Sequence, residues 1–162
     1  MAPGSATLAV AAAASILASG WASGMGTALS VFGIPTILNG GASSEVMVRQ
    51  WRFQFLRGQA IMPGLGALNA VNYWTVAYHC WSQGLEWRGF AVAGVSTFFM
   101  IPYTLVFIMP TNTKLLVASE SREKTLSHDS ATALLKKWGD LNVVRAVVAL
   151  VGTGFALWNF TV

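Results

Sequence analysis

Polar residues within one long apolar run are the first candidates for chemistry in this sequence. The run around residues 57–83 carries side chains that can ionise or form hydrogen bonds, namely Arg57, Asn69, Asn72, His79 and Gln83. At about 100° per residue, all of them fall within a wedge of about 120° on a helix. A strongly polar residue inside a membrane-spanning helix is costly to bury, so this wedge marks a candidate site.

The two ends of this wedge cannot serve one site. His79 and Arg57 are separated by roughly 33 Å along a straight helix, at about 1.5 Å per residue. We therefore favour the arginine end of the helix as the site. The opposite face of the same run carries Met62, Leu65 and Trp74, which are expected to contact lipid or neighbouring helices.

Two further runs contain residues that could complete such a site. Asn142 and Arg145 are three residues apart and share a helical face with Trp138. Tyr103 and Phe107 likewise share a face of the preceding run. Because bundles form their sites between facing helices, a pocket with aromatic walls, amides and a guanidinium is expected, and it would suit a flat aromatic ligand.

The segment IPYTLVFIMPTNTKLL (101–116) combines an apolar run with two prolines and a polar end. Pro110 is predicted to end the helix, so that Thr111 and Asn112 face inward at the mouth of the bundle. A plain helix exit with polar caps is the alternative interpretation.

The composition indicates an integral membrane protein. Hydrophobic residues make up 54% of the 162-residue chain and charged residues only 10%, whereas soluble domains have about 25% charged residues. The net charge of +4 does not indicate nucleic-acid binding, because the basic residues form no stripe with interleaved aromatics. The single cysteine and two distant histidines predict neither a disulfide nor a metal site, and no bound cofactor is expected.

Four apolar runs at about 8–38, 58–81, 89–110 and 141–161 are each near the ~20 residues that cross a bilayer as a helix. They predict an all-α, integral membrane four-helix bundle that forms a single domain over residues 1–162. The connections 39–57 and 111–140 carry eight of the ten basic residues, which places both in the cytosol. In a eukaryote the expected location is the endoplasmic reticulum or another endomembrane. The pair Gly20/Gly24 indicates either a seam between two copies of the chain or close packing within the bundle.

Three separated stretches, together with this layout, resemble the anthrone oxygenase family, which consists of small membrane proteins of aromatic polyketide pathways. They are RQWRFQFLRGQAIMPGLGAL (49–68), IPYTLVFIMPTNTKLL (101–116) and LLKKWGDLNVVRAVVALVG (134–152). The resemblance covers most of the chain. It implies an enzyme that oxidises the central methylene of an emodin-type anthrone to a carbonyl, with molecular oxygen as co-substrate and without metal or flavin. Deprotonation to an electron-rich anthrolate would let the substrate itself reduce oxygen.

The resemblance also suggests roles for individual residues. Arg57 and Arg145 would stabilise the anthrolate or a superoxide-like partner, and Asn112 with Asn142 would orient phenolic oxygens. His79 is a candidate for the general base, because it is the only imidazole in a predicted span, but it lies outside the three stretches, and the identity of the base stays open. The expected contacts with the substrate are Tyr103, Phe107, Trp138, Thr111, Asn72 and Trp51.

Two other functions are compatible with the sequence. A non-enzymatic membrane protein that binds a lipophilic aromatic ligand would bind an anthrone without consuming oxygen. A membrane enzyme of the glutathione-transferase type would need a basic site that stabilises a thiolate, and glutathione turnover would identify it.

Overall fold

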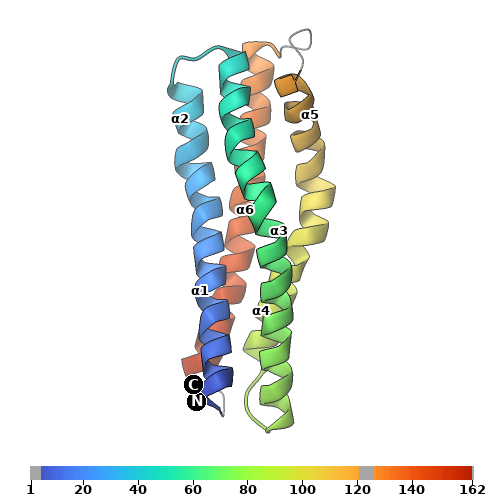
Figure 1. Cartoon of the computed structure of the whole chain (residues 1–162). Helices are drawn as coiled ribbons and strands as arrows, with labels where there is room; N and C mark the ends of the chain where they lie inside the picture. The colour runs from blue at the N-terminus through green and yellow to red at the C-terminus, as the bar shows by residue number, and fades with distance from the viewer. Residues whose placement is uncertain (1–4, 121–125, 162) are drawn as a thin grey trace.

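The protein is an antiparallel bundle of four long helical rods, seen here in a computed structural model that describes residues 5–120 and 126–161 (Figure 1). The prediction of an all-α bundle is confirmed. The start of α1 and the end of α6 lie at the same end of the bundle, and α1 and α4 each pack against α3 and α6. The elements in chain order are α1 (Ala6–Ala28), η1 (Leu29–Gly33), α2 (Ile34–Asn39), α3 (Ser44–Ser82), α4 (Arg88–Tyr103), η2 (Thr104–Ile108), α5 (Met109–Glu120) and α6 (His128–Thr161).

Three of the four rods are long and apolar enough to cross a membrane, namely Ala6–Asn39, Arg88–Glu120 and His128–Thr161. Helix α3 does not reach the same apolarity, because amides such as Gln59, Asn69 and Asn72 interrupt its central part. The predicted second span at 58–81 is therefore less apolar than the other three spans.

The polar connections are shorter than predicted. Helix α3 already begins at Ser44, and α5 continues to Glu120, so much of the expected connections 39–57 and 111–140 is helical. Basic residues misled the prediction here. Arg49 lies on the exposed side of α3, where it pairs with Glu45 at 3.5 Å, while Met47 and Trp51 on the opposite side of the helix are fully buried.

The helix also continues through Pro110, so the prediction that this proline ends it is wrong. Proline has no N–H, and its ring clashes with the carbonyl four residues earlier in a regular α-helix. Here the preceding turn, η2, is a π-helix in which the Met109 N–H donates to the Thr104 carbonyl, five residues back. This wider turn makes room for the proline ring. Thr111 and Asn112 nevertheless face inward as predicted, each only 2% exposed.

The first rod also accommodates a proline through a widened turn. The π-helix η1 lies two residues before Pro35, and the Ile34 N–H donates to the Leu29 carbonyl. Both π-helical turns thus widen a rod at mid-bundle, where residues of each turn face the interior. Such turns occur frequently at functional sites.

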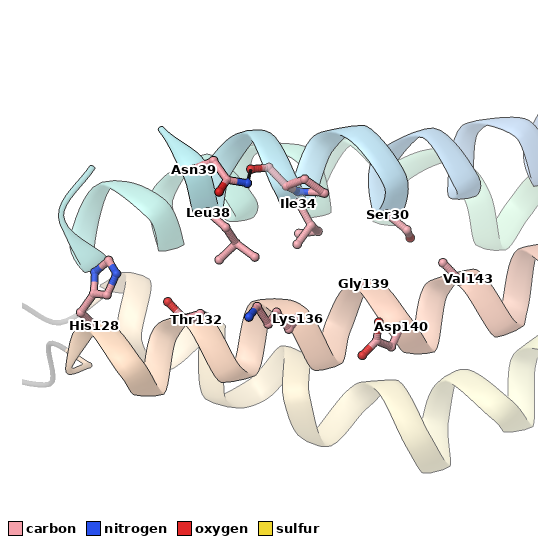
Figure 2. A pocket seen from close by; sticks show the side chains of 11 residues that line it. Ser30, Ile34, Leu38, Asn39, His128, Thr132, Lys136, Gly139, Asp140 and Val143 are labelled. Carbon is pink, nitrogen blue, oxygen red and sulfur yellow. Dashed lines mark hydrogen bonds between the residues drawn. The ribbon is translucent and has the colours of Figure 1, made fainter. Parts of the chain in front are cut away.

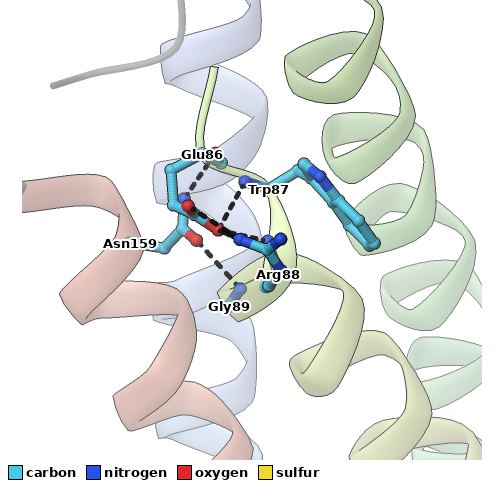
Figure 3. A network of polar contacts seen from close by, with 5 residues as sticks. All are labelled: Glu86, Trp87, Arg88, Gly89 and Asn159. Atoms are coloured by element: carbon cyan, nitrogen blue, oxygen red, sulfur yellow. Dashed lines mark hydrogen bonds and ion pairs between the residues drawn. The ribbon is translucent and has the colours of Figure 1, made fainter. Parts of the chain in front are cut away.

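The short connection between α3 and α4 is fixed by the last turn of α6 (Figure 3). The Asn159 side chain accepts a hydrogen bond from the Gly89 N–H at 2.9 Å and donates to the Glu86 carbonyl at 2.8 Å. The Glu86 carboxylate accepts from the Arg88 N–H and pairs with its guanidinium at 3.3 Å, which lowers the pKa of Glu86 below its usual value. The start of α4 is therefore held close against α6.

Two clusters of buried side chains fill the two ends of the bundle. The cluster near the chain termini is Leu8, Ala12, Tyr73, Val76, Ala77, Cys80, Phe90, Ala93 and Ala156. The cluster at the opposite end is Ile34, Ile37, Met47, Val48, Trp51, Tyr103, Ile108, Leu115, Ala131, Leu135 and Trp138. A cavity lies between these clusters, and Ile108 and Trp138 of the second cluster form part of its wall.

Candidate functional site

A cavity of about 330 Å³ lies within the bundle between the two buried clusters. All four rods contribute to its wall, which is mostly apolar. Its size falls within the ~300–1,000 Å³ typical of small-molecule sites. Its polar lining residues are Ser19, Ser23, Gln54, Gln59, Asn69, Thr97, Thr104, Asn112, Asn142 and Arg145.

Arg145 is the one charged side chain among the described residues that line this cavity. Within the described part of the chain it forms no ion pair. A guanidinium presents several donors in a planar fork and cannot lose its charge under physiological conditions. Arg145 therefore offers an unpaired positive charge to whatever occupies the cavity.

An amide–indole network lies one turn from Arg145 along α6. The Trp138 Nε1–H donates to Asn112 Oδ1 at 2.9 Å, and the Asn142 Nδ2 donates to the Trp138 carbonyl at 2.8 Å. These bonds fix both amides in orientation. The Asn112 Nδ2 and the Asn142 Oδ1 form no hydrogen bond with the described residues, which leaves one donor and one acceptor for a ligand.

Trp51 supports this network from behind without lining the cavity. Its ring meets that of Trp138 edge-on, with the centroids 6.0 Å apart, and stacks on Phe55 at 4.9 Å. Trp51 is completely buried and holds the Trp138 ring in place. The expected substrate contact by Trp51 is thus indirect.

Replacing Asn112 with leucine is expected to destabilise the protein by about 1–3 kcal/mol, because the buried Trp138 N–H loses its acceptor. Thermal unfolding in detergent measures this effect. Asn39→Leu is the matched control, since Asn39 is exposed and bonds only within its own helix. Equal unfolding midpoints for the two variants would show that the Asn112–Trp138 bond contributes nothing.

The structure does not bring Arg57 and His79 to the cavity. Arg57 is exposed, and its guanidinium lies 4.1 Å from the centroid of the Phe53 ring on the same side of α3. His79 is exposed near the end of α3, beside Tyr78. The predicted polar wedge on α3 thus divides, with Asn69 and Asn72 facing the bundle and the two ionisable residues facing outward.

The remaining predicted contacts are placed around the cavity rather than in it. Asn72 donates to the Ala11 carbonyl and to Ser15 Oγ, so it joins α3 to α1. Tyr103 donates to the Leu141 carbonyl at 3.2 Å and packs against Phe107, which is 53% exposed. The expected aromatic wall on this face is therefore directed away from the cavity. Thr111 is buried but is not among the lining residues.

Two cavity residues on α3, Gln54 and Gln59, were missed because they were assigned to a connection or overlooked beside charged neighbours. Met62 and Leu65, expected to face lipid or packing, also line the cavity. A helical repeat does mark this face. Its members recur every three or four residues, at Phe55, Gln59, Met62, Gly66 and Asn69.

A second hollow of about 450 Å³ is a groove on the outside of the bundle, between α2 and α6 (Figure 2). Its titratable residues, His128, Lys136 and Asp140, are all exposed. Charges in contact with solvent interact weakly. The groove is larger in volume, but the cavity within the bundle has the buried polar groups that fix a ligand, and we assign the site to the cavity.

In the described residues, no three His, Cys, Asp or Glu side chains come close enough to hold a metal ion. Gly20 and Gly24 also lack a neighbour inside the bundle. A methyl group added at either glycine would meet nothing within 4 Å, so close packing within the described bundle does not explain them.

Comparison with known proteins gives one consistent family. A family model described as anthrone oxygenase matches residues 51–155. A noranthrone monooxygenase of Aspergillus flavus is 34% identical over 77% of this chain, and the match spans 61% of that protein. An anthrone oxygenase of Pestalotiopsis fici is 33% identical over 80% of this chain and 95% of its own length. Another from Paecilomyces divaricatus is 28% identical over 91% of this chain. No solved structure is detectably similar.

Proposed function

The chain belongs to the anthrone oxygenase family, and we propose that it oxidises the central methylene of an anthrone to a carbonyl within the cavity around Arg145. The single observation that carries this proposal is an unpaired guanidinium at a mostly apolar cavity within the bundle. Apolar walls suit a flat aromatic substrate, and the positive charge suits an anion formed from it.

The first step is loss of a proton from the central methylene. This places negative charge on the carbonyl oxygen on the opposite side of the central ring, which gives the anthrolate. Arg145 stabilises that oxyanion, and the mostly apolar wall of the cavity strengthens the interaction relative to bulk water. The described lining contains no carboxylate, imidazole or thiol, so we infer that the proton passes to water at the cavity opening.

The next steps use the anthrolate as the reductant. It transfers one electron to molecular oxygen, and the resulting radical and superoxide combine to form a carbon–oxygen bond. Protonation gives a hydroperoxide, which loses water as its O–O bond and the remaining C–H bond break. One oxygen atom ends in the new carbonyl and the other in water, so we propose that the reaction needs no bound cofactor.

The amides and the indole ring position the substrate for these steps. Asn112 and Asn142 each have a free hydrogen-bonding atom fixed by the Trp138 network, which suits phenolic oxygens. The Trp138 ring provides a flat wall for stacking. Fixed geometry of this kind removes part of the entropic cost of reaching the transition state.

A lipophilic anthrone would reach this site from a membrane. We propose four spans, with residues 39–57 and 111–140 on the cytosolic side of the endoplasmic reticulum or another endomembrane. Some lining residues are exposed on the outer surface between α3 and the α4–α5 rod, which suits entry from lipid. They are Pro63, Ala67, Ile101 and Leu105. The open faces of Gly20 and Gly24 would allow a second copy to pack there.

Oxygen uptake by the purified protein with an emodin-type anthrone tests the proposal. We expect one oxygen molecule consumed per anthrone, the absorbance of the quinone product, and the same rate with a chelator. Heat-denatured protein gives the background of spontaneous oxidation. Binding without oxygen uptake would favour a non-enzymatic ligand-binding protein, and turnover of glutathione would favour a transferase.

A further inference from the structure

Two buried oxygens in the cavity wall lack hydrogen-bond partners in the described part of the chain. They are the Oγ of Ser23 on α1 and the Oε1 of Gln54 on α3. An unpaired buried polar group is unfavourable, so a bound ligand that pairs with it gains affinity.

Ser23 differs in this respect from other hydroxyl residues of the same bundle. Thr27, Ser30 and Thr153 each donate to the carbonyl four residues earlier in their helix, at 2.9–3.0 Å. Ser23 makes no such bond, although it is only 3% exposed. Ser23 lines the cavity, and no bond to its own helix holds its hydroxyl group away from a ligand there.

The two oxygens lie at different levels of the bundle, with Arg145 between them. The Gln54 Oε1 is 3.2 Å from the position that a Cβ would take on Gly33. Ser23 precedes Gly33 by ten residues, which is about 15 Å along the rod. Ala146, the neighbour of Arg145, meets the Cβ position of Gly26 at 3.5 Å, so the guanidinium residue lies at an intermediate level.

This spacing fits a tricyclic molecule with a hydroxyl on each terminal ring. Three fused rings separate such hydroxyls by on the order of 10 Å, and two hydrogen bonds of about 2.8 Å extend the reach to about 15 Å. We infer that Ser23 and Gln54 are specificity-determining residues that bind hydroxyls on the two terminal rings. The inference rests on the proposed function for the identity of the ring system.

This arrangement aligns the long axis of the substrate with the bundle and presents the central ring to Arg145. A tricyclic ligand without these hydroxyls leaves both oxygens unpaired, so the cavity discriminates against it. Sites built to pair with a hydroxyl reject analogues that lack it more strongly than apolar pockets reject a missing methylene.

Binding of two stable quinones to the purified full-length protein tests this inference. The ligands are 2,6-dihydroxyanthraquinone, which has a hydroxyl on each terminal ring, and unsubstituted anthraquinone. We expect Ser23→Ala and Gln54→Leu each to raise the Kd of the dihydroxy ligand about tenfold, and to change that of the unsubstituted ligand less than twofold. The controls are Thr27→Val and Gln50→Leu, exposed residues on the same two helices, which should bind both ligands as the wild type does.

An unchanged Kd for the dihydroxy ligand, or equal weakening for both ligands, would overturn the inference. The two variants lie on different helices, so either one decides the matter if the other fails to fold. The binding assay needs no turnover. Selective binding without oxygen uptake would therefore contradict the proposed function and leave the roles of Ser23 and Gln54 intact.

Discussion

Arg145→Met is expected to lower kcat by about 10²–10³-fold while leaving the fold intact, because Arg145 is the charged group that would stabilise the anthrolate. Methionine is long and flexible enough to occupy much of the same space. No carboxylate in the described residues pairs with Arg145, so its removal leaves no unpaired buried charge behind. The unfolding temperature should stay the same or rise.

Oxygen uptake under saturating anthrone, with thermal unfolding of the same samples, separates these two effects. Arg145→Lys keeps the charge but loses the planar fork, so an intermediate rate is expected. Arg49→Gln is the control for loss of a positive charge, because Arg49 is exposed and pairs with Glu45. A rate for Arg145→Met within threefold of the wild type would show that the guanidinium does not act in the reaction.

Arg57→Gln distinguishes the sequence-based interpretation from the structural one. The resemblance gives Arg57 and Arg145 the same role and predicts a similar loss of activity. The structure places the Arg57 guanidinium on the Phe53 ring, outside the cavity, and predicts little loss. The arginine could not be placed from the sequence, because a long side chain at the edge of a polar face can turn either way.

Part of the cavity wall was nevertheless predictable. Asn112, Trp138, Asn142 and Arg145 were all identified from the sequence, and the structure brings all of them to one cavity. Three lie on one helix at spacings of three and four residues, so local geometry alone fixes their common face. The residue that pairs with this face from a neighbouring helix was harder to predict. The Asn112–Trp138 bond joins residues 26 positions apart and depends on how α5 packs on α6.

The path of the chain at Pro110 shows where local signals are insufficient. Proline in a helix allows an end, a kink or a widened turn, and the sequence does not choose between them. The helix continues here because α5 has an apolar anchor in the bundle, with Leu115 completely buried in the cluster that includes Trp51 and Trp138. Burial of that anchor offsets the hydrogen bond lost at the proline.

Helices α4 and α6 approach each other closely, and glycines at their contact make that approach possible. A Cβ on Gly89 would lie 2.3 Å from the Phe155 carbonyl oxygen and 2.6 Å from the Asn159 Cβ. A Cβ on Gly152 would lie 2.6 Å from the Ser96 Cβ. These atoms belong to backbone or to the first side-chain carbon, so they cannot move aside without shifting a helix.

Gly89→Ala and Gly152→Ala are therefore expected to destabilise the protein by about 1–3 kcal/mol each, since both force α4 away from α6. Gly89→Ala should have the larger effect, because it also disturbs the Asn159 bonds to Gly89 and Glu86 (Figure 3).

Gly154→Ala is the matched control, on the same helix as Gly152. Nothing lies within 4 Å of its Cβ position, so the better helix propensity of alanine should stabilise it by up to about 1 kcal/mol. Thermal unfolding in one detergent compares the variants. If Gly89→Ala and Gly152→Ala unfolded at or above the temperature of Gly154→Ala, the result would contradict the close approach of α4 to α6 at these two glycines.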